Sequence, residues 1–109
     1  MDESTITAFN NPKYATRGIA AELPPELQLS LWCMIADLRR CGMPLDYLQV
    51  FKLDTISIGE QSLQQITHTQ EVPPYKNTVT VRIEVPVGGR KVFCIDDGTH
   101  STMLFAEEY

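Results

Sequence analysis

The 109-residue chain has few of the residues on which common catalytic and metal sites depend. Two histidines, His68 and His100, are all that it offers for acid–base chemistry near neutral pH. Cys33, Cys41 and Cys94 form no closely spaced pair, which disfavours both a disulfide framework and a zinc knuckle. We therefore expect reduced, mostly buried thiols. The chain also lacks the glycine motifs that cradle phosphates and the spacing of a calcium loop.

Long apolar runs and a surplus of basic residues are missing as well. No apolar run approaches the roughly 20 residues that cross a bilayer, and the N-terminus lacks the pattern of a secretion signal, so a cytoplasmic location is expected. The net charge of −5 opposes direct binding to nucleic acid. Four of the acids lie in the last fourteen residues, which contain no Lys or Arg. Such a tail favours a basic protein partner.

The composition that remains is that of an ordinary folded domain. Hydrophobic residues make up 43% of the chain and charged residues 21%, which suits a single core. We predict a flexible lead-in over residues 1–12 and one domain over residues 13–109. The fold class is α+β, with one main helix packed on an antiparallel meander sheet of about five to six strands.

One helix is clearly marked, from Pro25 to Cys41. Prolines preset its start, Arg39 and Arg40 lie in its last turn, and Gly42 stops it. One stripe has apolar residues at helical spacing and should pack on the sheet: Leu27, Leu31, Met34, Ile35, Leu38 and Cys41. A second apolar stripe lies on the opposite side: Leu29, Trp32 and Ala36.

The first strands are predicted from alternation and from the positions of glycine and proline. Residues 14–21 are predicted as a strand with a bulge or close backbone approach at Gly18. Residues 47–53 have large apolar side chains on both phases, which indicates a central strand covered on both faces. Residues 63–72 are rich in Gln and Thr and end at two prolines, which favours an edge strand with His68 part-exposed.

The last strands follow from cleaner signals. Residues 79–85 alternate strictly between apolar and polar side chains. The Gly88-Gly89 pair predicts a hairpin that joins this strand to residues 91–95. A second turn at Asp97-Gly98 leads to a final strand over residues 101–106.

The second helix stripe is the main candidate for a binding surface, because Trp is enriched among interface hot spots. The predicted partner-binding residues are Leu29, Trp32, Ala36, Arg39, Asp96, Asp97, Glu107 and Glu108. If the stripe is open, it implies a protein partner or a homodimer. The alternative is that the N-terminal segment or the final strand covers it.

Catalysis has weaker support. Asp97, His100 and Ser101 superficially resemble a triad, but they flank a tight turn, where these residue types serve backbone geometry. We expect no catalytic residues, no metal and no cofactor.

Several blocks of the sequence resemble one known family. They are residues 14–18, 25–32, 46–51 and 69–73, and Ile95-Asp96-Asp97-Gly98 running on to the C-terminal Glu-Glu-Tyr. The family is domain of unknown function 960, which comprises small uncharacterised proteins of Firmicutes and their mobile elements. The resemblance implies an intact single-domain member without an established activity or site.

Three functional hypotheses follow. The first is a non-enzymatic protein-interaction module. Its most specific version is a phage or mobile-element inhibitor, anti-CRISPR-like, of a basic nucleic-acid-processing enzyme such as a Cas9-type nuclease. Such nucleases hold nucleic acid in positively charged channels that an acidic protein could block. The second is a housekeeping cytosolic adaptor or self-associating structural protein. The third is a small hydrolase or metalloenzyme around Asp96, Asp97 and His100.

Overall fold

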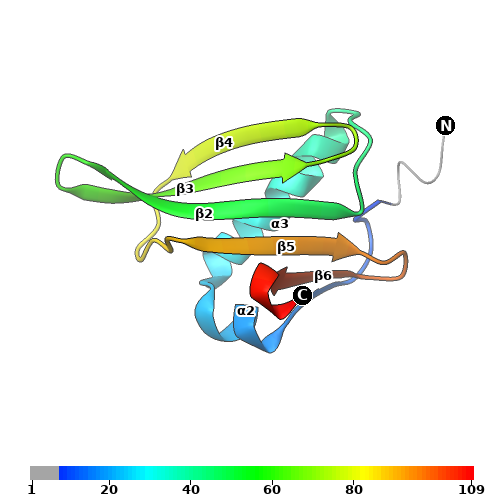
Figure 1. Cartoon of the computed structure of the whole chain (residues 1–109), viewed down its shortest axis with the longest axis horizontal. Helices are drawn as coiled ribbons and strands as arrows, with labels where there is room; N and C mark the ends of the chain where they lie inside the picture. The colour runs from blue at the N-terminus through cyan, green and yellow to red at the C-terminus, as the bar shows by residue number, and fades with distance from the viewer. Residues whose placement is uncertain (1–7) are drawn as a thin grey trace.

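The computed structural model describes residues 8–109 as one six-stranded sheet, with a long helix across one of its faces and a short helix at one edge (Figure 1). Its elements in chain order are β1 (Lys13–Ala15), α2 (Arg17–Glu22), α3 (Pro25–Arg40), β2 (Leu48–Ile58), β3 (Gln61–Gln70), β4 (Tyr75–Val81), β5 (Arg90–Asp96), β6 (Ser101–Phe105) and the 3-10 turn η1 (Ala106–Glu108). The strand order is β1-β6-β5-β2-β3-β4.

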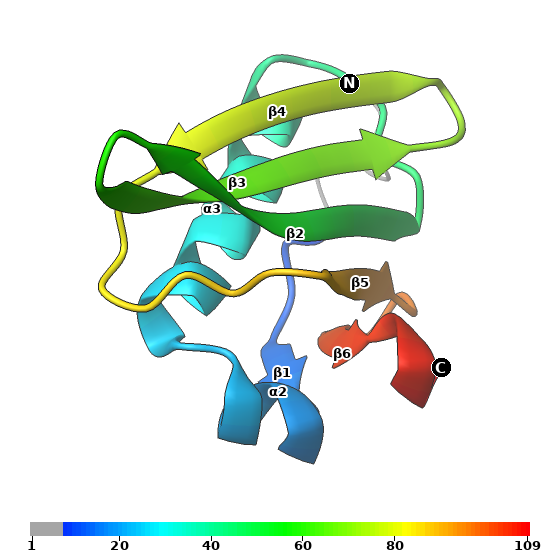
Figure 2. The ribbon, with the colours of Figure 1, turned by 60° about the vertical axis from the view of Figure 1, so that its left-hand side comes forward.

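The sheet is mixed, so the predicted antiparallel meander is wrong, while the α+β class is confirmed. β2, β3 and β4 do form an antiparallel meander, but β5 pairs with the other side of β2. β1 then joins β6 in parallel and closes that end of the sheet. Figure 2 shows α3 behind β2 and β3, α2 below them beside β1, and η1 next to β6.

The main helix, α3, is where the sequence places it. It begins at Pro25 and ends at Arg40, with Cys41 as its C-terminal cap. Gly42 follows with a φ of 85°, a left-handed conformation that glycine adopts without a Cβ clash. The helix therefore stops because its next residue can leave the right-handed region cheaply.

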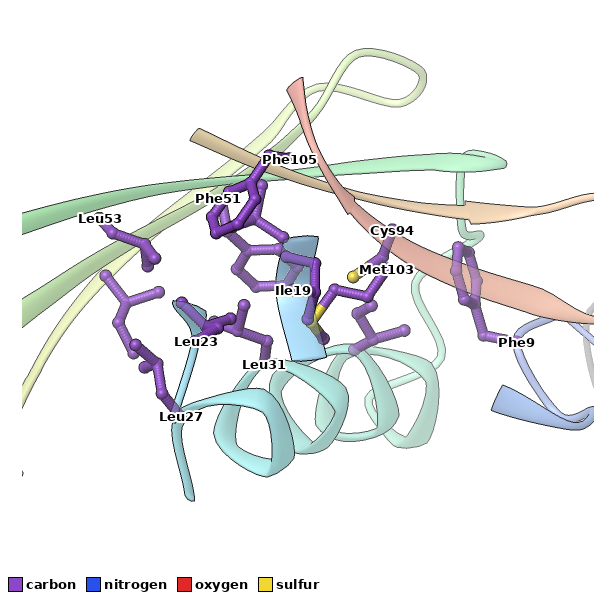
Figure 3. Packing of buried hydrophobic residues seen from close by; sticks show 13 residues of the cluster. Phe9, Ile19, Leu23, Leu27, Leu31, Phe51, Leu53, Cys94, Met103 and Phe105 are labelled. Atoms are coloured by element: carbon purple, nitrogen blue, oxygen red, sulfur yellow. The ribbon is translucent and has the colours of Figure 1, made fainter. Parts of the chain in front are cut away.

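The core lies between α3 and the sheet (Figure 3). Four residues of the predicted stripe are buried there: Leu27, Leu31, Ile35 and Leu38. They meet Phe51, Leu53, Ile66 and Val92 of the sheet, and each fully buried side chain of this size contributes about 1.5–3 kcal/mol. The other two predicted members differ, because Met34 is partly exposed and Cys41 is exposed at the helix end.

The predicted strand over residues 14–21 is wrong beyond Ala15, because a short helix replaces it. Thr16 caps α2 by accepting a hydrogen bond from the Ile19 N–H, and Ile19 enters the core. The bulge or close backbone approach predicted at Gly18 is not what the structure shows, because the glycine lies in α2 and a side chain approaches it. A Cβ there would lie 2.7 Å from a Glu108 carboxylate oxygen.

Part of the predicted lead-in belongs to the folded domain. Phe9 is 2% exposed and joins the core. Its N–H donates to Asp96 Oδ2 at 3.0 Å, and its carbonyl accepts from Lys13 Nζ at 2.8 Å. The predicted boundary at residue 13 is therefore too late, while residues 1–7 of the predicted lead-in lie outside the described residues.

β3 is an interior strand, so its prediction as an edge strand is wrong. The prolines after it form a connection that returns the chain as β4, which pairs with β3 from Gln64 to Gln70. His68 is consequently 1% exposed, between Phe51 of β2 and Asn77 of β4, and is not part-exposed at an edge.

The predicted hairpin at Gly88-Gly89 is also wrong, because β4 and β5 lie on opposite sides of the β2–β3 pair. The connection crosses the sheet end instead. Buried Gln64 holds it with both ends of its amide: Oε1 accepts from the Val87 N–H at 2.7 Å, and Nε2 donates to the Val87 carbonyl at 2.8 Å. A Cβ on Gly88 would lie 2.9 Å from Thr55 Oγ1, so the glycine permits this close crossing.

Candidate functional site

The sheet face opposite α3 carries a strip of partly exposed apolar side chains. Leu48 pairs with Ile95, and Val50 pairs with Phe93, so the four residues are contiguous across β2 and β5. All four are partly exposed. The prediction that β2 is covered on both faces is therefore wrong, because one face of the strand is open. The exposed ring of Tyr109 meets Phe93 edge-on at 5.7 Å. We call Leu48, Val50, Phe93 and Ile95 the apolar strip.

A lysine pair adjoins the apolar strip. Lys52 of β2 lies directly opposite Lys91 of β5, and both are exposed. This pair is two residues along each strand from the Val50–Phe93 pair. Lys76 of β4 lies on the same face, and Asp54 is the one carboxylate at a strand position of that face. Like charges directly opposite across strands are destabilising. The part of this face around Lys52, Lys76 and Lys91 is therefore positive on a protein whose net charge is −5, while the carboxylates of η1 lie beside β5.

The predicted acidic patch is largely engaged within the protein. Asp96 accepts hydrogen bonds from the N–H groups of Phe9 and Gly98 and from the side chain of Asn11. Burial alone would raise the pKa of Asp96, but these hydrogen bonds outweigh it and lower the pKa below its usual value. Asp96 ties the N-terminal segment to the β5–β6 turn.

The other three predicted acids have structural partners as well. Asp97 accepts hydrogen bonds from the N–H groups of His100 and Thr99, which lower its pKa. Glu107 forms an ion pair with Arg90 at 3.1 Å. Glu108 accepts from the Phe105 N–H and the Thr16 hydroxyl, which lower its pKa. Each of these exposed groups therefore has at least one partner within the described protein, and Asp97 and Glu108 have two or more.

The triad-like residues near the β5–β6 turn do not align as a nucleophile and its base. His100 Nε2 lies 3.2 Å from Asp97 Oδ2, and its Nδ1 lies 2.9 Å from Thr99 Oγ1. Ser101 is buried, and its hydroxyl donates to the Asn11 side chain. The cluster stabilises the turn and the N-terminal segment.

The second helix stripe is covered in part by the N-terminal segment. Lys13 Nζ lies over the Trp32 ring, 5.6 Å from its centroid, and Trp32 is partly buried against the core. Arg39 donates to the Ala8 carbonyl at 3.2 Å. Leu29 remains 64% exposed, while Ala36 is intermediate. The structure thus brings Trp32 and Arg39 close to the segment that Asp96 anchors, but Glu107 and Glu108 lie elsewhere, with Arg90 and Thr16.

A cavity of about 540 Å³ lies between the C-terminal end of α3 and strands β3 and β4. Its lining residues include Met34, Cys41, Met43, His68 and Tyr75. The His68 ring stacks on Phe51 at 4.4 Å and meets Tyr75 edge-on at 5.4 Å. Burial lowers the pKa of His68 to about 4, so the ring is neutral at physiological pH.

A network of buried amides supports His68. His68 Nε2 lies 2.6 Å from Gln49 Oε1, and Gln49 Nε2 donates to Gln70 Oε1 at 2.7 Å. Gln70 Nε2 donates in turn to the carbonyls of Pro44 and Pro73 at 3.0 and 2.9 Å. The network fixes the two connections beside the cavity. Its signal in the sequence is that His68 and Gln70 share one strand phase, but the prediction of an edge strand with His68 part-exposed missed it.

The cysteines depart from the predicted mostly buried state. All three are free, and Cys33 and Cys41 are exposed, while Cys94 is buried in the core. Within residues 8–109, no group of three or more His, Cys, Asp or Glu side chains is placed to hold a metal ion. The helices of that same range are too short or too polar to cross a membrane.

Comparison with known proteins places the chain in a family. None of the curated proteins matches it. A crystal structure of a protein of unknown function from Enterococcus faecalis has a similar fold, with a TM-score of 0.74 and 23% sequence identity over 92% of each chain. The family described as Staphylococcal protein of unknown function (DUF960) matches residues 12–108. Because this match spans almost the whole chain, the protein belongs to the DUF960 family.

Proposed function

We propose that this protein is a non-enzymatic interaction module that binds a protein partner through the open sheet face. The observation that carries the proposal is the Lys52–Lys91 pair beside the apolar strip. Two lysines directly opposite each other weaken strand pairing in the free protein, and a site that breaks a local folding rule is a candidate for function. A carboxylate placed between them would remove the repulsion.

The positive charge around Lys52, Lys76 and Lys91 favours an acidic partner segment that also carries apolar side chains. The apolar strip offers the hydrophobic contact, and Lys52, Lys76 and Lys91 offer the electrostatic one. Self-association through this face would bring like charges together. A basic partner, including a Cas9-type nuclease, stays a prediction from composition, and the engagement of Asp96, Asp97, Glu107 and Glu108 is why we favour the sheet.

The test is a charge reversal with a matched control. The variant Lys52→Glu/Lys91→Glu should lose partners that the wild-type protein captures from a staphylococcal lysate at low salt. The control Arg17→Glu/Arg40→Glu makes the same change in net charge at two exposed positions of α2 and α3, and should keep them. Capture should weaken as salt rises, because the pair and its partner are screened.

Two outcomes would overturn the proposal. Equal capture by both variants would remove the sheet face from the interaction. Loss of all capture after nuclease treatment would show that the face binds nucleic acid and not protein. Sedimentation velocity on the wild-type protein separately tests the homodimer, for which a monomer is the expected result.

A further inference from the structure

The cavity beside α3 contains a hydrogen-bond acceptor that the protein leaves unused. Gln49 Nε2 donates to the Asp46 carbonyl and to Gln70 Oε1, so the remaining oxygen of Gln49, Oε1, must accept from His68 Nε2. That nitrogen therefore carries the ring proton. Nδ1 of His68 is left with a lone pair.

This lone pair has no partner in the described part of the protein. His68 is 1% exposed, and its Nδ1 makes no hydrogen bond with any described residue. The described side chains nevertheless include no fully buried nitrogen or oxygen without a partner, so Nδ1 reaches accessible space. His68 is also one of the residues that line the cavity. A buried acceptor of this kind can be satisfied only by a hydrogen-bond donor that enters the cavity.

The walls around the acceptor favour an aromatic occupant. Three sulfur-containing side chains line the cavity, those of Met34, Cys41 and Met43. Tyr75 adds an aromatic edge, already in contact with His68. Thioether sulfur makes favourable contacts with aromatic rings and adapts to their shape. The volume of about 540 Å³ lies within the range of sites for small molecules.

The charge at the cavity disfavours an anion. Asp37 lines it, and no Lys or Arg is among its lining residues. The C-terminal end of α3, with its partial negative charge, lies at the same place, since Leu38, Cys41 and Gly42 also line the cavity. An occupant that donates hydrogen bonds and is neutral or cationic fits these surroundings.

We propose that this cavity binds a small aromatic compound, neutral or cationic, whose N–H group donates a hydrogen bond to His68 Nδ1. The site is separate from the sheet face, since it lies on the side of the sheet that carries α3. Whether the cavity binds such a compound is therefore independent of whether the sheet face binds a protein.

The test uses paired probes that differ in a single property. Indole has the N–H donor, and 1-methylindole keeps the ring without it. Tryptamine adds a cation, and indole-3-acetate adds an anion. Titrated into the ¹⁵N-labelled full chain, indole should shift the amide signals of Gly42, Asn77 and Val79 with a dissociation constant on the order of 1 mM or tighter. Methylation of the ring nitrogen should weaken binding by about tenfold, and indole-3-acetate should bind more weakly than tryptamine.

Variants of the protein complete the test. Asn77→Phe places a ring in the cavity from β4 without touching the amide network and should abolish binding. Its control, Thr78→Phe, makes the same change at the next residue, which faces the other side of the sheet. His68→Phe should remove the preference for indole over 1-methylindole. Equal affinity for those two probes, unchanged binding by Asn77→Phe, or no saturable shift with indole and tryptamine would each overturn the proposal.

Discussion

Replacing Phe9 with alanine tests whether the N-terminal segment is part of the folded domain. The side chain is 2% exposed and packs in the core cluster, so the change removes a buried ring and leaves a cavity. Phe→Ala substitutions at such sites cost about 3–5 kcal/mol. Phe9 also has a φ of 57°, a conformation that costs a non-glycine residue about 1–2 kcal/mol and that packing must offset. We expect Phe9→Ala to lower the free energy of unfolding by about 3 kcal/mol.

Urea unfolding followed by far-ultraviolet circular dichroism measures this loss. With a slope of about 1–3 kcal/mol per molar urea, the midpoint should fall by roughly 1–3 M. Tyr14→Ala is the control, because Tyr14 is an aromatic residue of the adjoining strand β1 but is 57% exposed, and it should cost less than about 1 kcal/mol. A loss within about 1 kcal/mol of wild type for Phe9→Ala, at an unchanged slope, would refute the packing argument.

Two further predictions concern the buried polar residues of β3. Gln64→Leu leaves the Val87 N–H and carbonyl without their side-chain partner and should lower the free energy of unfolding by about 1–3 kcal/mol. Hydrogen exchange at the Val87 amide should accelerate. The control Gln65→Leu, on the other face of the sheet, should leave this exchange unchanged. Unaltered hydrogen exchange at Val87 in Gln64→Leu would contradict the role of the two Gln64–Val87 hydrogen bonds. For His68, folding lowers the pKa from about 6.5 to about 4, so between these values the unfolded chain binds more protons and stability falls as pH falls. The free energy of unfolding is not reduced by His68 protonation above about pH 6.5, and the reduction should reach about 3 kcal/mol below pH 4. Imidazole NMR should show His68 unprotonated at pH 5, and a titration midpoint near 6.5 would exclude the buried neutral ring.

The comparisons with known proteins support the fold but give no function. The Enterococcus faecalis protein shares the architecture at 23% identity, a likeness that supports the strand order and helix placement alone. The lysine pair and the cavity are therefore features to examine in this chain directly. They lie on different sides of the sheet, so each of the two proposals can fail without the other.

Local signals in the sequence determined the elements that depend on neighbouring residues. α3 is correct at both ends because Pro25, its basic last turn and Gly42 act within one or two turns. The turn at Asp97-Gly98, where Gly98 has a φ of 99°, is correct for the same reason. The four buried leucine and isoleucine residues of α3 follow from helical spacing alone.

Pairing between distant strands could not be read in this way. The period of two along β3 marks two faces without saying which is buried, and the Gln and Thr content suggested a wet edge. Burial of Gln64, His68 and Gln70 depends on partners in β2, in the 82–89 connection and in the proline loops. The cavity at His68 could therefore not be found from sequence, because its walls come from α3, β3 and β4.

The sequence by itself determined a single α+β domain, its main helix and its family. The tertiary structure decided which acids are free, which face of the sheet is open and where the N-terminal segment lies. Strand order is set by the free energy of packing whole faces together, and no local residue preference carries that information. The acidic tail thus became a set of internal hydrogen-bond acceptors, and the candidate surface moved to Lys52 and Lys91, which lie 39 positions apart in the chain and opposite each other in the sheet.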